Sequence, residues 1–104
     1  MSDVLVAGTQ ITLDDEGFLT DPSEWSPDVA SELAANIGLE LSDEHWAAIN
    51  FARTDFEENG ETPTLRRMAQ AGGVSTKEMF RLFPKKPAKK MAYVAGLPKP
   101  VGCV

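Results

Sequence analysis

Apolar residues in the first nineteen positions occur in short runs separated by turn-forming residues. One run covers residues 4–6, a second covers 11–13, and a third covers 18–19; Gly8-Thr9 lies between the first two, and residues 14–17 (Asp-Asp-Glu-Gly) between the last two. Short apolar and β-branched runs bounded by turn residues are typical of antiparallel strands. We therefore expect a small antiparallel β-meander at the N-terminus.

From residue 26 onward the apolar residues follow the spacing of helices. Ser26 and Pro27 suit the first positions of a helix, and Gly38 suits its end. The residues expected to open the other four helices are Ser42, Thr62-Pro63, Ser75 and Pro87, and those expected to close them are Asn59-Gly60, Gly72-Gly73, Pro84 and Tyr93. The expected fold class is α+β: a small N-terminal antiparallel β-meander packed on about five helices, with an extended, mobile C-terminal arm.

The length of 104 residues suits a single domain, 1–104, with its own modest hydrophobic core. Its last residues, 95–104, break the helical pattern because they contain two prolines and two glycines. Pro98 and Pro100 favour an extended course, so we expect residues 95–104 to form a flexible arm. At roughly 3.1–3.3 Å per residue, the stretch from Gly96 to Cys103 could span about 25 Å.

Cys103 is the only cysteine of the chain and its penultimate residue. A single thiol near a terminus can be incidental. The arm, however, interleaves apolar Leu97, Val101 and Val104 with conformationally restricted residues, whereas tails without a function are usually polar and of low complexity. We therefore take Cys103 as the candidate catalytic residue, carried by an arm suited to docking into another protein.

The counts of cysteine and histidine exclude several classes of site. One cysteine cannot form an internal disulfide or a multi-cysteine zinc site, and His45, the only histidine, makes a His-based metal site or a Ser-His-Asp triad improbable. We expect neither a metal nor an organic cofactor. The N-terminus lacks the features of a signal peptide, and no apolar run approaches about 18 residues, so the expected location is the cytoplasm, without a membrane partner.

The net charge of −6 is unevenly distributed. Residues 1–52 contain eleven Asp and Glu and no Lys or Arg, whereas residues 53–104 contain five Asp and Glu and all ten Lys and Arg, which gives −11 and +5. A basic half can meet nucleic acid or an acidic protein surface. The two halves can equally well complement each other inside the folded domain.

One further pattern supports an alternative interpretation of the function. The expected third and fourth helices, joined by residues 71–74, have the outline of a helix-turn-helix with Arg66, Arg67, Lys77 and Arg81 nearby, which suggests a regulatory binding module. The acidity of the chain and the apolar content of the fourth helix argue against direct nucleic-acid binding. Such a module remains an alternative hypothesis.

Charged residues near the arm bear on the reactivity of its thiol. Lysines could favour the thiolate of Cys103, whereas the terminal carboxylate of Val104 opposes it. His45 could act as a base only if the fold brought it to the thiol, so we expect a helix-surface or core-edge position for it. Its spacing to Ser42 does not match a capping box, which uses Glu or Gln. The lysines concerned are Lys85, Lys86, Lys89, Lys90 and Lys99.

Several motifs together resemble one known family. The tail sequence 95–100 (Ala-Gly-Leu-Pro-Lys-Pro) with its penultimate cysteine, the segments 81–85 and 87–89, and the motifs at 15–19, 25–26 and 41–46 resemble the DsrC/TusE family of sulfur-carrier proteins over nearly the whole chain. The resemblance implies a β-meander packed on helices with a mobile arm. It also implies that Cys103 is the functional thiol.

The resemblance further implies a single-cysteine, TusE-like form of the family. DsrC proper has a second cysteine eleven positions upstream, where this chain has Ala92, so an intramolecular disulfide is excluded. The implied function is a sulfurtransferase-type carrier that accepts sulfane sulfur as a persulfide on Cys103 and passes it to a partner through the arm. The partner could belong to tRNA 2-thiouridine synthesis; a DsrC-like partner of dissimilatory sulfite reductase or of sulfur oxidation, or a purely structural subunit, is the alternative.

Overall fold

The computed structural model describes residues 2–98, so Cys103 and the arm from residue 99 onward lie outside the described residues. None of the helices in this range is long and apolar enough to cross a membrane. The elements are β1 (Ser2–Val6), β2 (Thr9–Leu13), the 3-10 helix η1 (Pro22–Glu24), α1 (Pro27–Asn36), α2 (Asp43–Asn59), α3 (Leu65–Gln70), α4 (Thr76–Leu82) and α5 (Pro87–Ala95).

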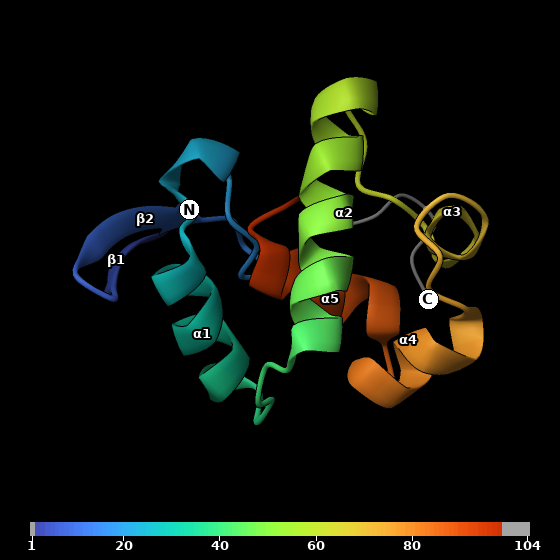
Figure 1. The fold of residues 1–104 in the computed structure, drawn as a ribbon. Coiled ribbons are helices and arrows are strands. Elements are labelled where there is room, and N and C mark those ends of the chain that lie inside the picture. The colour runs from blue at the N-terminus through green and yellow to red at the C-terminus, as the bar shows by residue number, and fades with distance from the viewer. Residues whose placement is uncertain (1, 99–104) are drawn as a thin grey trace.

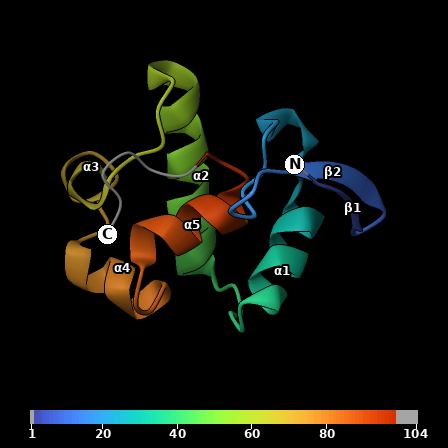
Figure 2. The ribbon, with the colours of Figure 1, turned by 180° about the vertical axis from the view of Figure 1, so that it is seen from behind.

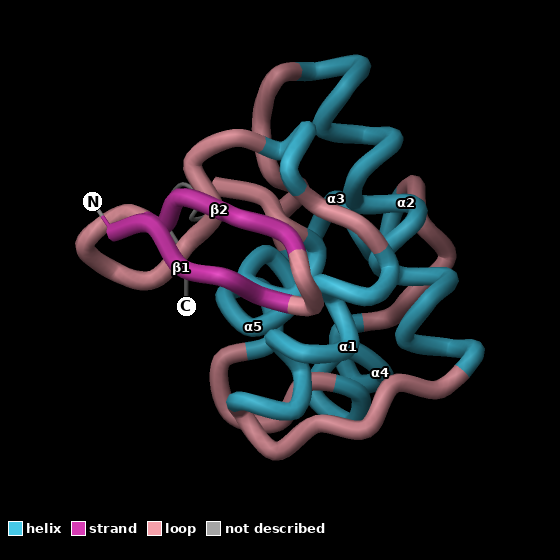
Figure 3. Tube along the Cα trace, turned by 90° about the vertical axis from the view of Figure 1, so that its left-hand side faces the viewer, coloured by secondary structure: helices cyan, strands magenta, loops and turns pink. Residues whose placement is uncertain are grey.

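The N-terminal strands form an antiparallel hairpin in which Val4 pairs with Ile11. Both turn residues have positive φ, 50° at Ala7 and 78° at Gly8, as a tight hairpin turn requires. The third apolar run contributes only an isolated bridge between Leu13 and Leu19. The expected meander is therefore a two-stranded hairpin with one added bridge, and Figure 3 shows it at one edge of the helices.

Helix α5 lies at the centre of the helical array. It contacts α2, α1 and α4, and the two opposite views in Figures 1 and 2 place α1 and the hairpin toward one end of α5 and α3 and α4 toward the other. The two strands and five α-helices confirm the expected α+β class. Because α5 is the last element before the arm, every helix that packs on it helps to fix where the arm begins.

The core combines a few large side chains with many small ones. The largest include Phe18, Phe83 and Met91, which are fully buried. Several buried residues of the two helices in contact, α2 and α5, are alanines: Ala48 and Ala52 on α2, and Ala88, Ala92 and Ala95 on α5. Small residues let two helices approach closely, because their side chains leave little between the backbones. These buried alanines are therefore suited to a close packing of α5 in the helical array.

Two of the expected helix starts are confirmed at the level of single hydrogen bonds. Ser26 Oγ accepts from the backbone N–H of Val29 at 3.2 Å, and Ser75 Oγ accepts from that of Glu78 at 3.2 Å. Hydroxyl groups at these positions satisfy N–H groups that have no partner within the helix. The expected ends of these helices, at Gly38 and Pro84, also lie directly after the observed last turns.

Two other helix boundaries differ from the expectation. Thr62-Pro63 does not open α3, because the N-cap is Thr64, whose Oγ1 accepts from the backbone N–H of Arg67 at 3.1 Å. Helix α5 continues past Tyr93 to Ala95 and ends at Gly96, which has the positive φ of 70° that glycine adopts without strain. Both differences concern residues near the start of the arm: Thr62 lies in a loop before α3, and α5 extends to Ala95.

The environment of His45 also differs from the expectation, because it is buried and completes a capping box. Its Nδ1 accepts the backbone N–H of Ser42 at 3.1 Å, and its Nε2 lies 2.7 Å from the carbonyl oxygen of Leu82. A backbone N–H can only donate and a carbonyl can only accept, so Nδ1 acts as the acceptor and Nε2 as the donor in this pair of hydrogen bonds. The ring also packs edge-on against Phe83. His45 therefore joins the start of α2 to the end of α4.

Candidate functional site

The described chain ends at a firmly held segment, residues 96–98, which we call the arm root. Leu97 is 1% exposed and its N–H donates to the carbonyl of Ala92 at 2.9 Å. The carbonyl of Pro98 accepts from Thr62 Oγ1 at 2.7 Å, so the loop between α2 and α3 holds the other side of the chain. The arm root is therefore held from two sides, by the end of α5 and by the loop between α2 and α3.

Two side chains from distant elements hold the end of α5, and we call them the Trp25–Arg53 clamp. Trp25 Nε1 donates to the carbonyl of Val94 at 2.8 Å, and Arg53 Nη1 donates to the carbonyl of Ala95 at 2.7 Å. The guanidinium carbon of Arg53 lies 4.1 Å from the centre of the Trp25 ring, a cation–π arrangement. The last carbonyls of a helix have no partner within it, so the clamp satisfies two of them.

The charge of Arg53 suits its position. A cation at the C-terminus of a helix is favoured by the helix dipole. Partial burial lowers the pKa of Arg53 from its usual value, and the nearby carboxylate of Glu57 opposes this effect. Because an arginine side chain starts from so high a pKa, it stays protonated in proteins and keeps both the hydrogen bond and the contact with the ring. The clamp thus persists across the pH range in which a thiol reacts.

Gly96 allows the clamp to close. A Cβ atom at this position would lie 2.5 Å from Cδ1 and 2.8 Å from Cβ of Trp25, well inside van der Waals contact. The Cβ atom of Trp25 is next to its backbone and has little freedom to move away. Gly96 is therefore needed both for its positive φ and for its lack of a side chain.

A polar cavity of about 450 Å³ lies beside the arm root, between the end of α2 and the start of α3. The carboxylate of Asp55, which is 4% exposed, faces it: Oδ1 accepts from Arg67 Nε at 3.0 Å, from Arg67 Nη2 at 2.7 Å and from Asn59 Nδ2 at 2.9 Å. These bonds and the charge of Asp55 raise the pKa of Arg67 further. Thr62, which holds the arm root, lines the same cavity.

Replacing Asp55 with alanine should lower the free energy of unfolding by about 2 kcal/mol, because three hydrogen bonds to a buried carboxylate are lost while Arg67 can turn to water. Chemical denaturation monitored by circular dichroism would measure this. The matched control is Glu58→Ala, an exposed carboxylate on the same helix, which should change stability by no more than about 0.5 kcal/mol. Equal effects of the two changes would contradict the assignment.

The ion pairs bear on the helix-turn-helix alternative. Arg67 is bound to Asp55, and Arg81 forms an ion pair with Glu44. Two of the four cations that this alternative invoked are therefore engaged in contacts within the protein. The pair between Arg81 and Glu44 also joins the basic half of the chain to the acidic half, as the second interpretation of the charge distribution expects.

The structure brings together only some of the residues singled out from the sequence. His45 is buried and bonded to Leu82, which leaves it no free nitrogen for a role as base. Ala92 lies fully buried next to Leu97, directly under the arm root. Within residues 2–98 no group of three or more His, Cys, Asp or Glu side chains could hold a metal ion. Cys103 lies outside the described residues.

The sequence did not indicate the residues that hold the arm root: Trp25, Arg53 and Thr62. From the sequence, Thr62 is expected only to open a helix, and Trp25 belongs only to the motif at 25–26. The hydrogen bonds to the end of α5 and to the arm root span 36 to 69 positions of the sequence. No local pattern could indicate such contacts. The one available signal was Gly96, a helix-terminating glycine next to the proline-rich tail.

Comparison with known proteins connects this arrangement to one family. The family described as DsrC-like protein matches residues 5–104. The sulfurtransferase TusE of Salmonella typhimurium is 38% identical over 108 aligned positions, which cover 97% of this chain and 99% of that protein. The match reaches the arm as well as the folded part of the chain.

Solved structures agree with the sequence comparison. The NMR structure of DsrC from Allochromatium vinosum superposes with a TM-score of 0.86 at 40% identity, covering 99% of this chain and 98% of that one. A chain in the crystal structure of dissimilatory sulfite reductase I also gives a TM-score of 0.86, at 32% identity, covering 99% and 100%. The overall fold thus recurs in these proteins, and the chain belongs to the DsrC-like protein family.

Proposed function

We propose that this protein is a sulfur carrier in a TusE-like relay and that it carries the sulfur as a persulfide on Cys103. Membership of the DsrC-like family and similarity to proteins named sulfurtransferase TusE support the carrier role. The observation that most supports the assignment to Cys103 is the construction of the arm root. A buried leucine, a glycine at which any side chain would clash with Trp25, and three distant side chains fix the start of an arm that carries the only thiol.

The reach of the arm suits this function. Cys103 follows Pro98 by five residues, so it can lie at most about 16 Å from the arm root. That distance is enough to enter a pocket of a docked partner.

The chemistry requires only thiol exchange. The Cys103 thiolate attacks the outer sulfur of a donor persulfide, the S–S bond of the donor breaks, and the donor leaves as a thiolate while Cys103 becomes a persulfide. An acceptor thiolate then attacks the outer sulfur of Cys103, and the Cys103 thiolate is released. Each step exchanges one S–S bond for another, so the two steps together need no external oxidant, reductant or cofactor.

Two kinds of partner are consistent with the proteins that this chain resembles. The relatives named sulfurtransferase TusE favour a sulfur relay, for which the family resemblance implies tRNA thiolation as the end point, and the similar chain within a dissimilatory sulfite reductase structure favours a partner of that kind. Ala92 favours the first. Without a second thiol this chain cannot release its sulfur by closing a disulfide on itself, so it needs a thiol supplied by the acceptor.

Intact mass spectrometry of the full chain after exposure to a protein persulfide donor tests the proposal. We expect one added sulfur atom, removal of that atom by a reductant, and its loss to an acceptor thiol. Peptide mapping should place it on Cys103. Absence of a sulfur adduct with cysteine-desulfurase and sulfurtransferase donors alike would overturn the proposal.

A further inference from the structure

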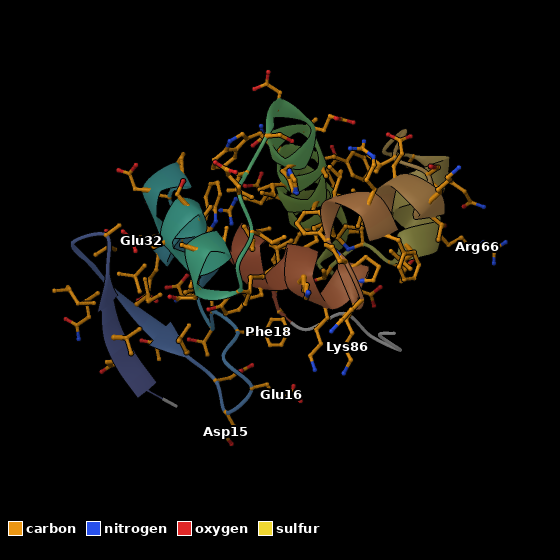
Figure 4. The ribbon with its side chains drawn as sticks, turned by 90° about the horizontal axis from the view of Figure 1, so that it is seen from below. Asp15, Glu16, Phe18, Glu32, Arg66 and Lys86 are labelled. Atoms are coloured by element: carbon orange, nitrogen blue, oxygen red, sulfur yellow. The ribbon has the colours of Figure 1, made fainter. Side chains whose placement is uncertain are left out.

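A second cavity, of about 270 Å³, lies along α5, from its N-cap Lys86 to Tyr93 in its last turn. Phe18, Ile37 and Tyr93 form its apolar part, and the side chains of Lys86, Lys89, Lys90 and Glu16 complete its lining. We call it the basic groove. Figure 4 shows Phe18, Glu16 and Lys86 gathered on one side of the molecule, with Arg66 far from them.

The floor of the basic groove is apolar and is formed by packed side chains. Phe18 is 2% exposed and packs edge-on against Tyr93, with ring centres 6.4 Å apart. Ile37 and Tyr93 are half-buried, so part of each remains available for contact. Lys89 and Lys90 are also half-buried, which fits aliphatic stems that lie along the apolar surface and charged ends that reach water. The groove therefore offers an apolar seat surrounded by ammonium groups.

The charge of the groove is not balanced by the fold. Three lysines and one glutamate give its lining a formal charge of +2, on a chain whose net charge is −6. Among residues 2–98, Lys86, Lys89 and Lys90 form no ion pair with a described carboxylate, in contrast to Arg67 and Arg81. The first turn of α5 also contains no acidic residue. Like charges that lie close together repel one another and oppose folding, so a role in binding another molecule would account for this cluster.

We propose that the basic groove binds a short acidic segment of a protein partner, with one apolar side chain of that segment on Phe18, Ile37 and Tyr93 and its carboxylates on the lysines. Identifying this partner as a sulfur donor or acceptor rests on the proposed function; the binding itself does not. The charges are complementary, and the apolar floor suits a peptide side chain better than a phosphate backbone. The strongly acidic N-terminal half would repel an extended nucleic acid.

The position of the groove relates it to the arm. Helix α5 has nine residues and is therefore about 13 Å long; the groove lies along it from Lys86 to Tyr93, and the arm root follows its end. The arm can carry Cys103 at most about 16 Å from the arm root. A partner whose acidic segment occupies the groove can thus present a thiol within reach of Cys103.

A titration of the ¹⁵N-labelled full chain with the acetylated peptide DEELDE, followed by NMR, tests the proposal. At about 50 mM salt, where charge interactions are weakly screened, we expect saturable shifts at Ile37, Lys86, Lys89, Lys90 and Tyr93. The peptide NQQLNQ, without charge, and the peptide DEESDE, without the apolar side chain, should each bind at least about ten-fold more weakly. Shifts confined to other surfaces, or none up to millimolar peptide, would overturn the proposal.

Variants separate the groove from general charge effects. The triple change Lys86→Gln, Lys89→Gln, Lys90→Gln should lower the affinity for DEELDE about ten-fold or more, whereas Lys77→Gln, an exposed lysine on α4, should leave it unchanged. Cys103→Ala should bind the peptide as well as the parent chain, so a failure of the sulfur-carrier proposal would not hide a working groove. Tighter binding of an RNA hairpin to the same residues would overturn the proposal in favour of a nucleic-acid site.

Discussion

Replacing Cys103 with alanine should abolish both sulfur loading and sulfur relay while leaving the melting temperature of the protein unchanged. The chain contains no other thiol, so no second residue can take over the exchange. The last buried residue that the structure describes is Leu97, six positions earlier, and the known supports of the arm root all lie before Cys103. Mass spectrometry of the persulfide and thermal melting followed by circular dichroism would measure the two effects.

The matched control for this variant is Val101→Ala, which changes the same tail and keeps the thiol. It should load sulfur to the same extent as the parent chain from a small persulfide donor. Relay of sulfur by the Cys103→Ala variant would show that the protein acts as a subunit that positions other components. Loss of loading in Val101→Ala would mean that the tail sequence, and not only the thiol, is needed for the chemistry.

Replacing Gly96 with alanine should lower the free energy of unfolding by about 3 kcal/mol. About 1–2 kcal/mol comes from the left-handed backbone conformation, φ = 70°, and the rest from forcing a Cβ atom against Trp25. The clamp cannot close without displacing Trp25 or tilting the end of α5. Below its melting temperature the variant should therefore pass sulfur to a partner protein more slowly, while its thiol reacts normally with a small alkylating reagent.

Gly38 provides a close control for this change. It also follows a helix and has a φ of 72°, but a Cβ atom there would meet nothing within 4 Å. Gly38→Ala should therefore cost only the backbone term, about 1–2 kcal/mol, and should leave the rate of sulfur relay unchanged. Equal losses of stability in the two variants would show that the contact with Trp25 contributes nothing.

The order and type of the elements could be predicted because their signals are local. Ser26 and Ser75 cap helices through hydrogen bonds to residues three positions on, and such spacing is visible in a sequence. Local signals also explain the errors. Thr62 and Thr64 are both residues that can cap a helix, and the sequence did not indicate that Thr64 is the N-cap of α3. In the capping box of α2 a histidine stands where Glu or Gln is usual, so the sequence did not indicate this box.

The sequence indicated the chemistry of the candidate site but not the contacts that hold it in place. The position of Cys103 and the proline-rich tail pointed to a carried thiol, and this assignment remains a prediction. The clamp of Trp25 and Arg53 on α5 could not be anticipated, because it depends on which helix faces lie together. Buried alanines on α2 and α5 are part of that packing, and small residues give only a weak hydrophobic signal in a sequence.

The single helix that joins the groove to the arm root has a consequence for the order of events in a relay. Helix α5 lines the groove and leads directly into the arm root, so a partner docked in the groove always lies at the same distance from the arm root. Donor and acceptor proteins that use the groove would be mutually exclusive, and sulfur would move by successive binary complexes in which the carrier dissociates between them. Partners would then need no common fold, only a common spacing between an acidic segment and a reactive cysteine.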